Sequence, residues 1–144
     1  MTALIRFTAP LLLGISLLAC GSASPVDETR EGTLEDDDPR VEDDNSPYDE
    51  YQIDVGEGWT IEAEMTSSDF DPYLWLIGPD GHSIIQDDDG GEGLTARFEH
   101  TATAAGTYTV RANSYDGTGR GAYRLTYSAE PGSGQSDEEP REAE

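Results

Sequence analysis

Apolar and polar side chains alternate along short stretches in the middle of this chain. Tyr51, Ile53 and Val55 occupy every second position, and later runs repeat the same spacing. Successive side chains of a strand point to opposite faces, so this period of two predicts strands with one buried and one solvated face. Glycine, aspartate and proline clusters separate the runs, and no helical periodicity of useful length accompanies them. The pattern predicts an all-β antiparallel β-sandwich.

The alternating runs follow one another closely, and about seven to eight strands are expected from them. They cover residues 50–55, 59–66, 73–77, 82–86, 94–99, 106–112 and 121–127. We assign the folded domain to residues 48–129. Cys20 is the only cysteine, so no disulfide within the chain can stabilise this domain and its core has to hold it together.

A β-hairpin is predicted around the Gly-Pro-Asp-Gly sequence at residues 78–81. Proline suits the φ near −65° of a turn, and glycine tolerates the positive φ that such turns need. If the turn is centred between its proline and aspartate, paired positions across the hairpin sum to 159. Trp75 then faces Ile84, and Asp71 faces Asp88.

Five carboxylates lie where the two strands of this hairpin begin and end. They are Asp69, Asp71, Asp87, Asp88 and Asp89. Carboxylates brought together repel one another unless something compensates, and a Ca²⁺ ion with six to eight oxygen ligands is one solution. Aspartates beside proline and glycine also cap loops by accepting backbone N–H bonds. Calcium is therefore a candidate cofactor, and structural capping is the alternative.

The first strand of the hairpin carries apolar side chains on both faces. Leu74 and Leu76 point to one face, and Tyr73 and Trp75 point to the other. A sandwich buries only one face of each sheet, so we expect Tyr73, Trp75 and Ile84 to form an exposed patch for a polymer or protein ligand. Packing inside the domain, or cover from a loop, is the alternative.

The N-terminus has the features of a secretory signal, which we assign to residues 1–19. Arg6 precedes a short apolar run that is too short to span a membrane as a helix. The run ends in Leu-Leu-Ala-Cys at residues 17–20, which resembles a bacterial lipobox and implies that Cys20 is acylated. Several acyl chains hold a protein durably on a membrane. We expect an exported protein anchored at the outer membrane or cell surface; an ordinary signal peptide is the alternative.

Acidic segments flank the expected domain on both sides. Residues 20–47 carry ten acids and two arginines with few apolar side chains, and residues 130–144 have a similar composition. Such segments bury too little surface to offset their ordering entropy, so we expect a disordered tether and a disordered tail. Without Arg6 the chain has seven arginines, no lysine and 31 acids, a net charge of −24. Nucleic-acid binding is excluded by this charge.

Four sequence blocks resemble the bacterial pre-peptidase C-terminal domain. They are Asp-Phe-Asp-Pro-Tyr-Leu-Trp-Leu at 69–76, Gly-Pro-Asp-Gly at 78–81, Asp-Asp-Asp-Gly at 87–90 and Ala-Gly-Thr-Tyr-Thr-Val at 105–110. The resemblance implies a jelly-roll-like β-sandwich of the kind appended to secreted proteases. It also implies that surface aromatic side chains bind a polymer, as in some relatives, and that calcium is bound, as in several.

Catalysis is not expected. His82 and His100 have no second metal-type ligand beside them, and no serine lies in a Gly-x-Ser-x-Gly turn. We predict a membrane-anchored, non-catalytic β-sandwich module that binds a cell-envelope or extracellular polymer or protein. A structural envelope lipoprotein without its own ligand is one alternative, and a helper of a secreted peptidase acting in trans is another.

Overall fold

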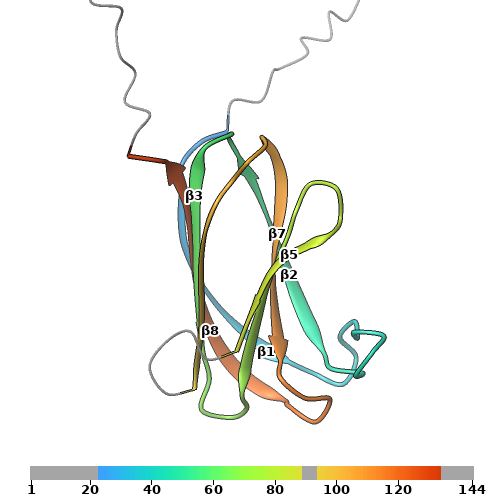
Figure 1. Cartoon of the computed structure of the whole chain (residues 1–144). Helices are drawn as coiled ribbons and strands as arrows, with labels where there is room; N and C mark the ends of the chain where they lie inside the picture. The colour runs from blue at the N-terminus through green and yellow to red at the C-terminus, as the bar shows by residue number, and fades with distance from the viewer. Residues whose placement is uncertain (1–22, 89–93, 134–144) are drawn as a thin grey trace, which may run out of the picture.

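The computed structural model describes residues 23–88 and 94–133, which form a two-layer β-sandwich (Figure 1). The strands are β1 (Val26–Leu34), β2 (Tyr48–Val55), β3 (Trp59–Thr66), β4 (Pro72–Ile77), β5 (Ser83–Asp87), β6 (Thr95–Thr101), β7 (Gly106–Ser114) and β8 (Gly121–Pro131). They pair antiparallel in two sheets, ordered β1-β8-β3-β6 and β2-β7-β4-β5. No helix occurs in these two ranges, and so none there is long and apolar enough to cross a membrane. The all-β antiparallel prediction is confirmed.

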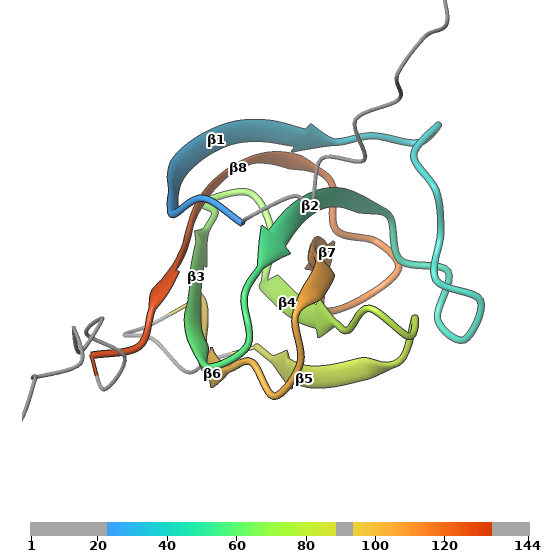
Figure 2. The same ribbon diagram turned by 90° about the horizontal axis from the view of Figure 1, so that it is seen from above.

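The core lies between the two layers, which are seen end-on in Figure 2. Alternate side chains of β3, β8, β4 and β7 point into it, as the period of two requires. The fully buried members include Ile61, Met65, Leu74, Leu76, Ala96, Val110, Ala112, Leu125 and Ala129. The outer face of each sheet lies away from this core and can carry polar side chains.

Strand β1 corrects the expectation that residues 20–47 form a disordered tether. Val26–Leu34 pairs with β8 along its whole length, and Leu34 is buried in the core. Glu28 and Arg30 lie on the same side of the strand as Leu34 but form an ion pair with each other at the open edge. Backbone pairing to β8 supplies the stabilisation that the acidic side chains do not, which composition alone does not reveal.

The acidic loop between β1 and β2 is also ordered, because two arginines hold it. Arg40 donates hydrogen bonds to the carbonyl oxygens of Asn45 at 3.0 Å and Asp36 at 2.8 Å. Arg120, from the loop before β8, donates to the Asp36 carboxylate at 2.9 Å. The folded unit therefore includes β1 and this loop, which lie before the expected boundary at residue 48.

The register of the β4–β5 hairpin differs from the expected one. Trp75 pairs with Gln86 and Leu76 with Ile85, so neither the Trp75–Ile84 pair nor the Asp71–Asp88 pair forms. The turn contains one more residue than expected, since Gly78 donates its N–H to the carbonyl of His82 at 2.9 Å, and Gly81 between them has a φ of 82°. A β-bulge between Leu76 and Ile77 then shifts the pairing again.

A chain of hydrogen bonds joins the two sheets inside the domain. The Tyr123 hydroxyl of β8 donates to the Asp49 carboxylate of β2 at 2.5 Å, and it lies 2.5 Å from the Tyr51 hydroxyl. Burial raises the pKa of Asp49, although the hydrogen bond from Tyr123 partly opposes this. The network satisfies three polar groups that the closing of the two layers takes away from water.

The packing of β1 against the core generates a stability prediction for Gly32→Ala. A Cβ on Gly32 would lie 2.3 Å from the ring of Tyr123, so the substitution should lower the free energy of unfolding by about 1–3 kcal/mol. Glu31→Ala, at an exposed neighbouring position of β1, should change it by less than about 0.5 kcal/mol. Urea denaturation of both variants measures the difference. Equal stability of Gly32→Ala and the unmodified chain would mean that β1 is not docked.

Candidate binding surface

The outer face of the β2-β7-β4-β5 sheet carries aromatic and charged side chains side by side. Because Leu74 and Leu76 are buried in the core, Tyr73 and Trp75 of β4 point outward and are half-buried. We define the outer aromatic face as Tyr48, Glu50, Tyr73, Trp75, Gln86 and Arg111. Strand pairing places these residues in two rows across the sheet. One row is Glu50–Arg111–Trp75–Gln86, and in the other Asn113 lies between Tyr48 and Tyr73.

Arg111 of β7 organises this face. Its guanidinium carbon lies 4.1 Å from the centroid of the Tyr48 ring and 5.2 Å from that of Trp75. The same guanidinium donates two hydrogen bonds to Oε1 of Glu50, at 3.0 and 2.7 Å. Cation–π attraction and the ion pair together fix the positions of three side chains at the centre of the sheet.

Tyr73 extends the face toward the end of the sandwich where β4 begins. Its ring meets those of Trp75 and Tyr115 edge to face, at centroid distances of 5.8 and 5.9 Å. Its hydroxyl donates to Oε1 of Gln86 at 2.8 Å. Tyr115 is 54 % exposed, which leaves aromatic surface available beside Tyr73. These edge-to-face pairs order the rings without covering them.

Ile84, the third residue of the expected patch, lies at the bulge of β5. The bulge leaves it opposite no residue of β4, and its side chain lies 3.0 Å from the position that a Cβ on Gly78 would take. Ile84 is 41 % exposed on the edge strand β5, against the turn. The structure thus brings the rings of Tyr73 and Trp75 into contact, and it places Ile84 at the bulge of the neighbouring strand.

The loop between β1 and β2 closes one end of the outer aromatic face. Nδ2 of Asn113 donates to the Ser46 hydroxyl at 2.9 Å and to the Pro47 carbonyl at 2.8 Å. Ser46 and Asn113 are fully buried by this contact. The ordered loop therefore supports Tyr48, the residue that follows it at the start of β2.

The acids of the hairpin take different roles. Asp69 accepts a hydrogen bond from the backbone N–H of Ala122 at 2.9 Å, and Asp87 accepts one from Arg97 at 2.8 Å. Both carboxylates thus accept hydrogen bonds from backbone N–H groups of other segments, which is the structural role that was the alternative to calcium binding. In residues 23–88 and 94–133 no three acid, histidine or cysteine side chains are grouped so that they could hold a metal. Asp89 lies outside the described residues.

Asp71 and Asp88 lie close enough for the charge of one to act on the other. Burial raises the pKa of Asp71, and the negative charges of Asp88 and Asp116 raise it further. The pKa of Tyr73 is raised as well, first by burial and then by the charge of Asp88. Two carboxylates and the phenol of Tyr73 thus share one end of the outer aromatic face.

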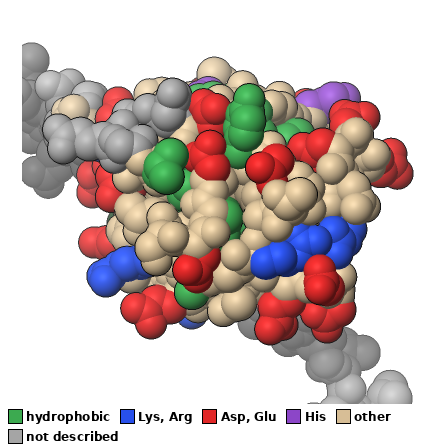
Figure 3. Space-filling view, turned by 90° about the horizontal axis from the view of Figure 1, so that it is seen from below, with side chains coloured by type: hydrophobic (Ala, Val, Ile, Leu, Met, Phe, Trp, Pro, Cys, Tyr) green, Lys and Arg blue, Asp and Glu red, His purple; other side chains and the backbone are tan. Residues whose placement is uncertain are grey.

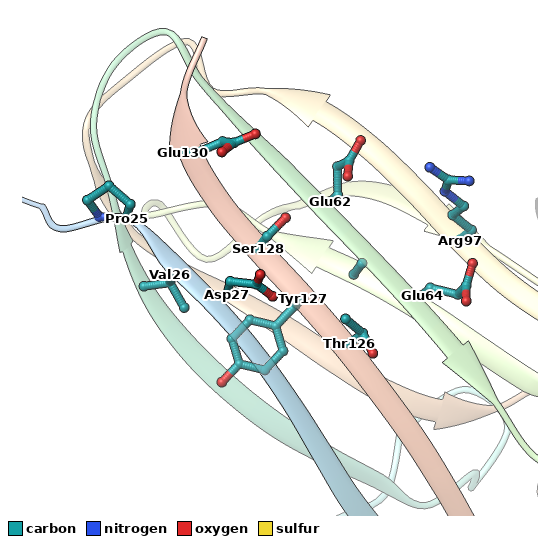
Figure 4. A pocket seen from close by; sticks show the side chains of 11 residues that line it. Pro25, Val26, Asp27, Glu62, Glu64, Arg97, Thr126, Tyr127, Ser128 and Glu130 are labelled. Carbon is teal, nitrogen blue, oxygen red and sulfur yellow. The ribbon is translucent and has the colours of Figure 1, made fainter.

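The outer face of the other sheet is a shallow acidic groove of about 520 Å³ (Figure 4). Glu62 and Glu64 of β3, Glu130 of β8 and Arg97 of β6 project toward it. The pKa of Glu62 is raised, chiefly by its hydrogen bond with Glu99, its partner across the β3–β6 pair. Apart from Tyr127 this groove has no aromatic side chain in its lining, so the two outer faces differ in chemistry.

Solved structures of two kinds are similar to this fold. The periplasmic inhibitor of g-type lysozyme PliG from Aeromonas hydrophila is 13 % identical, with a TM-score of 0.53 over 75 % of this chain and 88 % of that chain. The pre-peptidase C-terminal domain of a Bacillus anthracis collagenase is 18 % identical, with a TM-score of 0.52 over 71 % of this chain and 89 % of that one. No family model and no curated protein sequence matches the chain. At these identities the similarity shows a shared β-sandwich fold.

The crowding of Asp71 generates a pH prediction. Because its folded pKa is raised, Asp71 stabilises the fold below the ordinary pKa of an aspartate, and this contribution is lost as the pH rises through the folded value. Asp71→Asn should therefore have a higher Tm than the unmodified chain at pH 7, and the gain should shrink as the pH falls to about 4. Thermal denaturation over this pH range measures it.

Asp80→Asn serves as the control, because the pKa of Asp80 is shifted in the direction opposite to that of Asp71. The backbone N–H of His82 lowers the pKa of Asp80, so this carboxylate stabilises the fold when it is ionised. Asp80→Asn should thus lower the Tm at pH 7. If Asp71→Asn raised the Tm by the same amount at pH 7 and at about pH 4, the gain would not come from the ionised carboxylate of Asp71.

Proposed function

We propose that this chain is an exported, lipid-anchored and non-catalytic module that binds a polymer or protein partner through its outer aromatic face. The observation that carries the proposal is the stack of Arg111 between Tyr48 and Trp75 on a sheet whose other face fills the core. Tryptophan, tyrosine and arginine are the residues most enriched in interaction hot spots. The proposed face has all three, already held in fixed positions.

The polar atom of Trp75 supports a binding role over a packing role. Nε1 of Trp75 is buried and has no hydrogen-bond acceptor among the described residues. A buried donor without a partner costs about 1–3 kcal/mol, so tryptophan is a poor choice for stability alone at this position. We expect a partner to contact the exposed part of the Trp75 ring, since the ring is only half-buried on the outer face.

The structural similarities support binding without catalysis. PliG from Aeromonas hydrophila is an inhibitor of a lysozyme, and the collagenase segment is a pre-peptidase C-terminal domain. His82 and its ion-pair partner Asp80 are 85 % and 71 % exposed, so this pair has no enclosed site around it. A structural lipoprotein without a ligand, or a helper of a secreted peptidase, shares the fold but would not use the outer aromatic face.

Trp75→Ala tests the proposed binding surface. In the Cys20→Ser chain, which lacks the proposed lipid anchor, the affinity for purified envelope fragments measured by co-sedimentation should fall at least about tenfold, because a central anchor of the face is removed. Arg124→Ala changes an exposed residue on the opposite outer face and should bind as the unmodified chain does. Circular dichroism confirms that both variants are folded. Undiminished sedimentation of a folded Trp75→Ala chain would refute the role of this face.

The lipid anchor has a direct test. Intact mass measurement of the chain extracted with detergent should show a mature N-terminus at Cys20 with several acyl chains added. Cys20→Ser should shift the chain from the membrane fraction to the soluble fraction. A free thiol at Cys20, or a mature N-terminus elsewhere, would remove the anchor from the proposal.

Calcium binding at Asp69, Asp71, Asp87, Asp88 and Asp89 stays a prediction. If these carboxylates hold Ca²⁺, adding it to the EDTA-treated chain should raise the Tm, because a ligand that binds only the folded state stabilises that state. Mg²⁺ at the same concentration is the control, since it accommodates such a site poorly. An unchanged Tm would leave capping as the role of these aspartates.

A further inference from the structure

We propose that the outer aromatic face receives an arginine or lysine side chain of a partner protein, placed against Tyr73 and Tyr115 and beside the carboxylates of Asp71 and Asp88. The inference deepens the proposed function and rests on it, because it names the chemistry of the partner at the same surface. A cationic protein segment is the occupant to which the charges and rings of this region point.

The aromatic part of the argument starts from the cation that the face already holds. Arg111 lies over Tyr48 and Trp75 at distances typical of cation–π contacts, so the rings of this sheet accept a guanidinium. Tyr73 and Tyr115 continue the same surface, at right angles to each other. No cation–π contact involves either of these two rings within the described residues, and Tyr115 is the more exposed ring. They offer a second position of the kind that Arg111 occupies.

The electrostatic part comes from two carboxylates that form no ion pair among the described residues. The ion pairs of the described residues use Glu28, Asp36, Glu50 and Asp80, and none includes Asp71 or Asp88. Burial raises the pKa of Asp71, and the negative charges of Asp88 and Asp116 raise it further. A partner's ammonium or guanidinium would relieve the repulsion between Asp71 and Asp88 and form charge-assisted hydrogen bonds with them.

The overall charge agrees with this choice of partner. Seen from one end, the molecule shows acidic side chains spread around its surface and few basic ones (Figure 3). Such a field speeds the approach of a cationic protein and opposes an anionic polymer. The acidic groove of the other sheet shares the field but lacks the pair of tyrosines, and it therefore provides an internal control.

The test measures binding of a fluorescent octa-arginine peptide to the full chain by anisotropy, in EDTA so that no metal competes. Asp71→Asn combined with Asp88→Asn should weaken binding by about tenfold, because two charged contacts are lost. The matched control is Asp27→Asn combined with Glu64→Gln, which removes the same charge from the acidic groove. It should weaken binding by less than about twofold, through the net charge alone.

A second pair of variants tests the rings. Tyr115→Leu keeps the apolar volume but removes the aromatic face, and should weaken binding several-fold, whereas Tyr115→Phe should keep it. Equal losses for the two double variants would show attraction by net charge only and would overturn the inference, as would full binding by Tyr115→Leu.

The two proposals fail in different ways. If Trp75→Ala abolishes envelope binding while octa-arginine shows no preference for Asp71 and Asp88, only the cationic partner is refuted. If octa-arginine binds as expected but Trp75→Ala leaves envelope binding intact, the cation position stands and the Trp75 surface falls. Thermal denaturation accompanies every variant, and Asp71→Asn is expected to be at least as stable as the unmodified chain.

Discussion

The packing of one face of each sheet against the other is the interaction on which this structure depends. Side chains such as Ile61, Leu76 and Leu125 are fully buried between the layers, and no disulfide can assist them because Cys20 is the only cysteine. Burial at about 25 cal/mol per Å² of apolar surface is thus the main source of stability. Because the inner faces form the core, side chains that bind a partner can lie only on the outer faces and at the ends of the strands.

Periodicity predicted β2 to β8 because each of these strands places apolar side chains on the inner face. It missed β1, where only Val26 and Leu34 are large and apolar among the residues that face inward, and where Glu28 and Arg30 compensate each other. The hairpin register was wrong for another reason. Alternation is indifferent to a shift of two residues, and the extra residue of the turn and the bulge together make such a shift.

The alternation of apolar and polar residues predicted only part of the candidate site. A strand with apolar residues on both faces indicated Tyr73 and Trp75, whereas Arg111 was missed. Its position in β7, between the inward Val110 and Ala112, placed it on the outer face, but nothing in the sequence tells which strand lies beside β7. Neighbours across a sheet follow from the strand order, which local patterns do not encode.

The distribution of the few arginines explains the character of the surface. Arg40 and Arg120 hold the loop before β2, and Arg111 is neutralised by Glu50. These three arginines thus serve internal order, next to backbone carbonyls, aromatic rings and selected acids. Many of the remaining acidic side chains are exposed, which favours solubility, whereas Asp71 is partly buried beside Asp88 and Asp116. Because Arg40, Arg111 and Arg120 are engaged within the fold, its acidic surface favours partners that carry positively charged side chains. The aromatic rings beside Asp71 mark where such a side chain binds best.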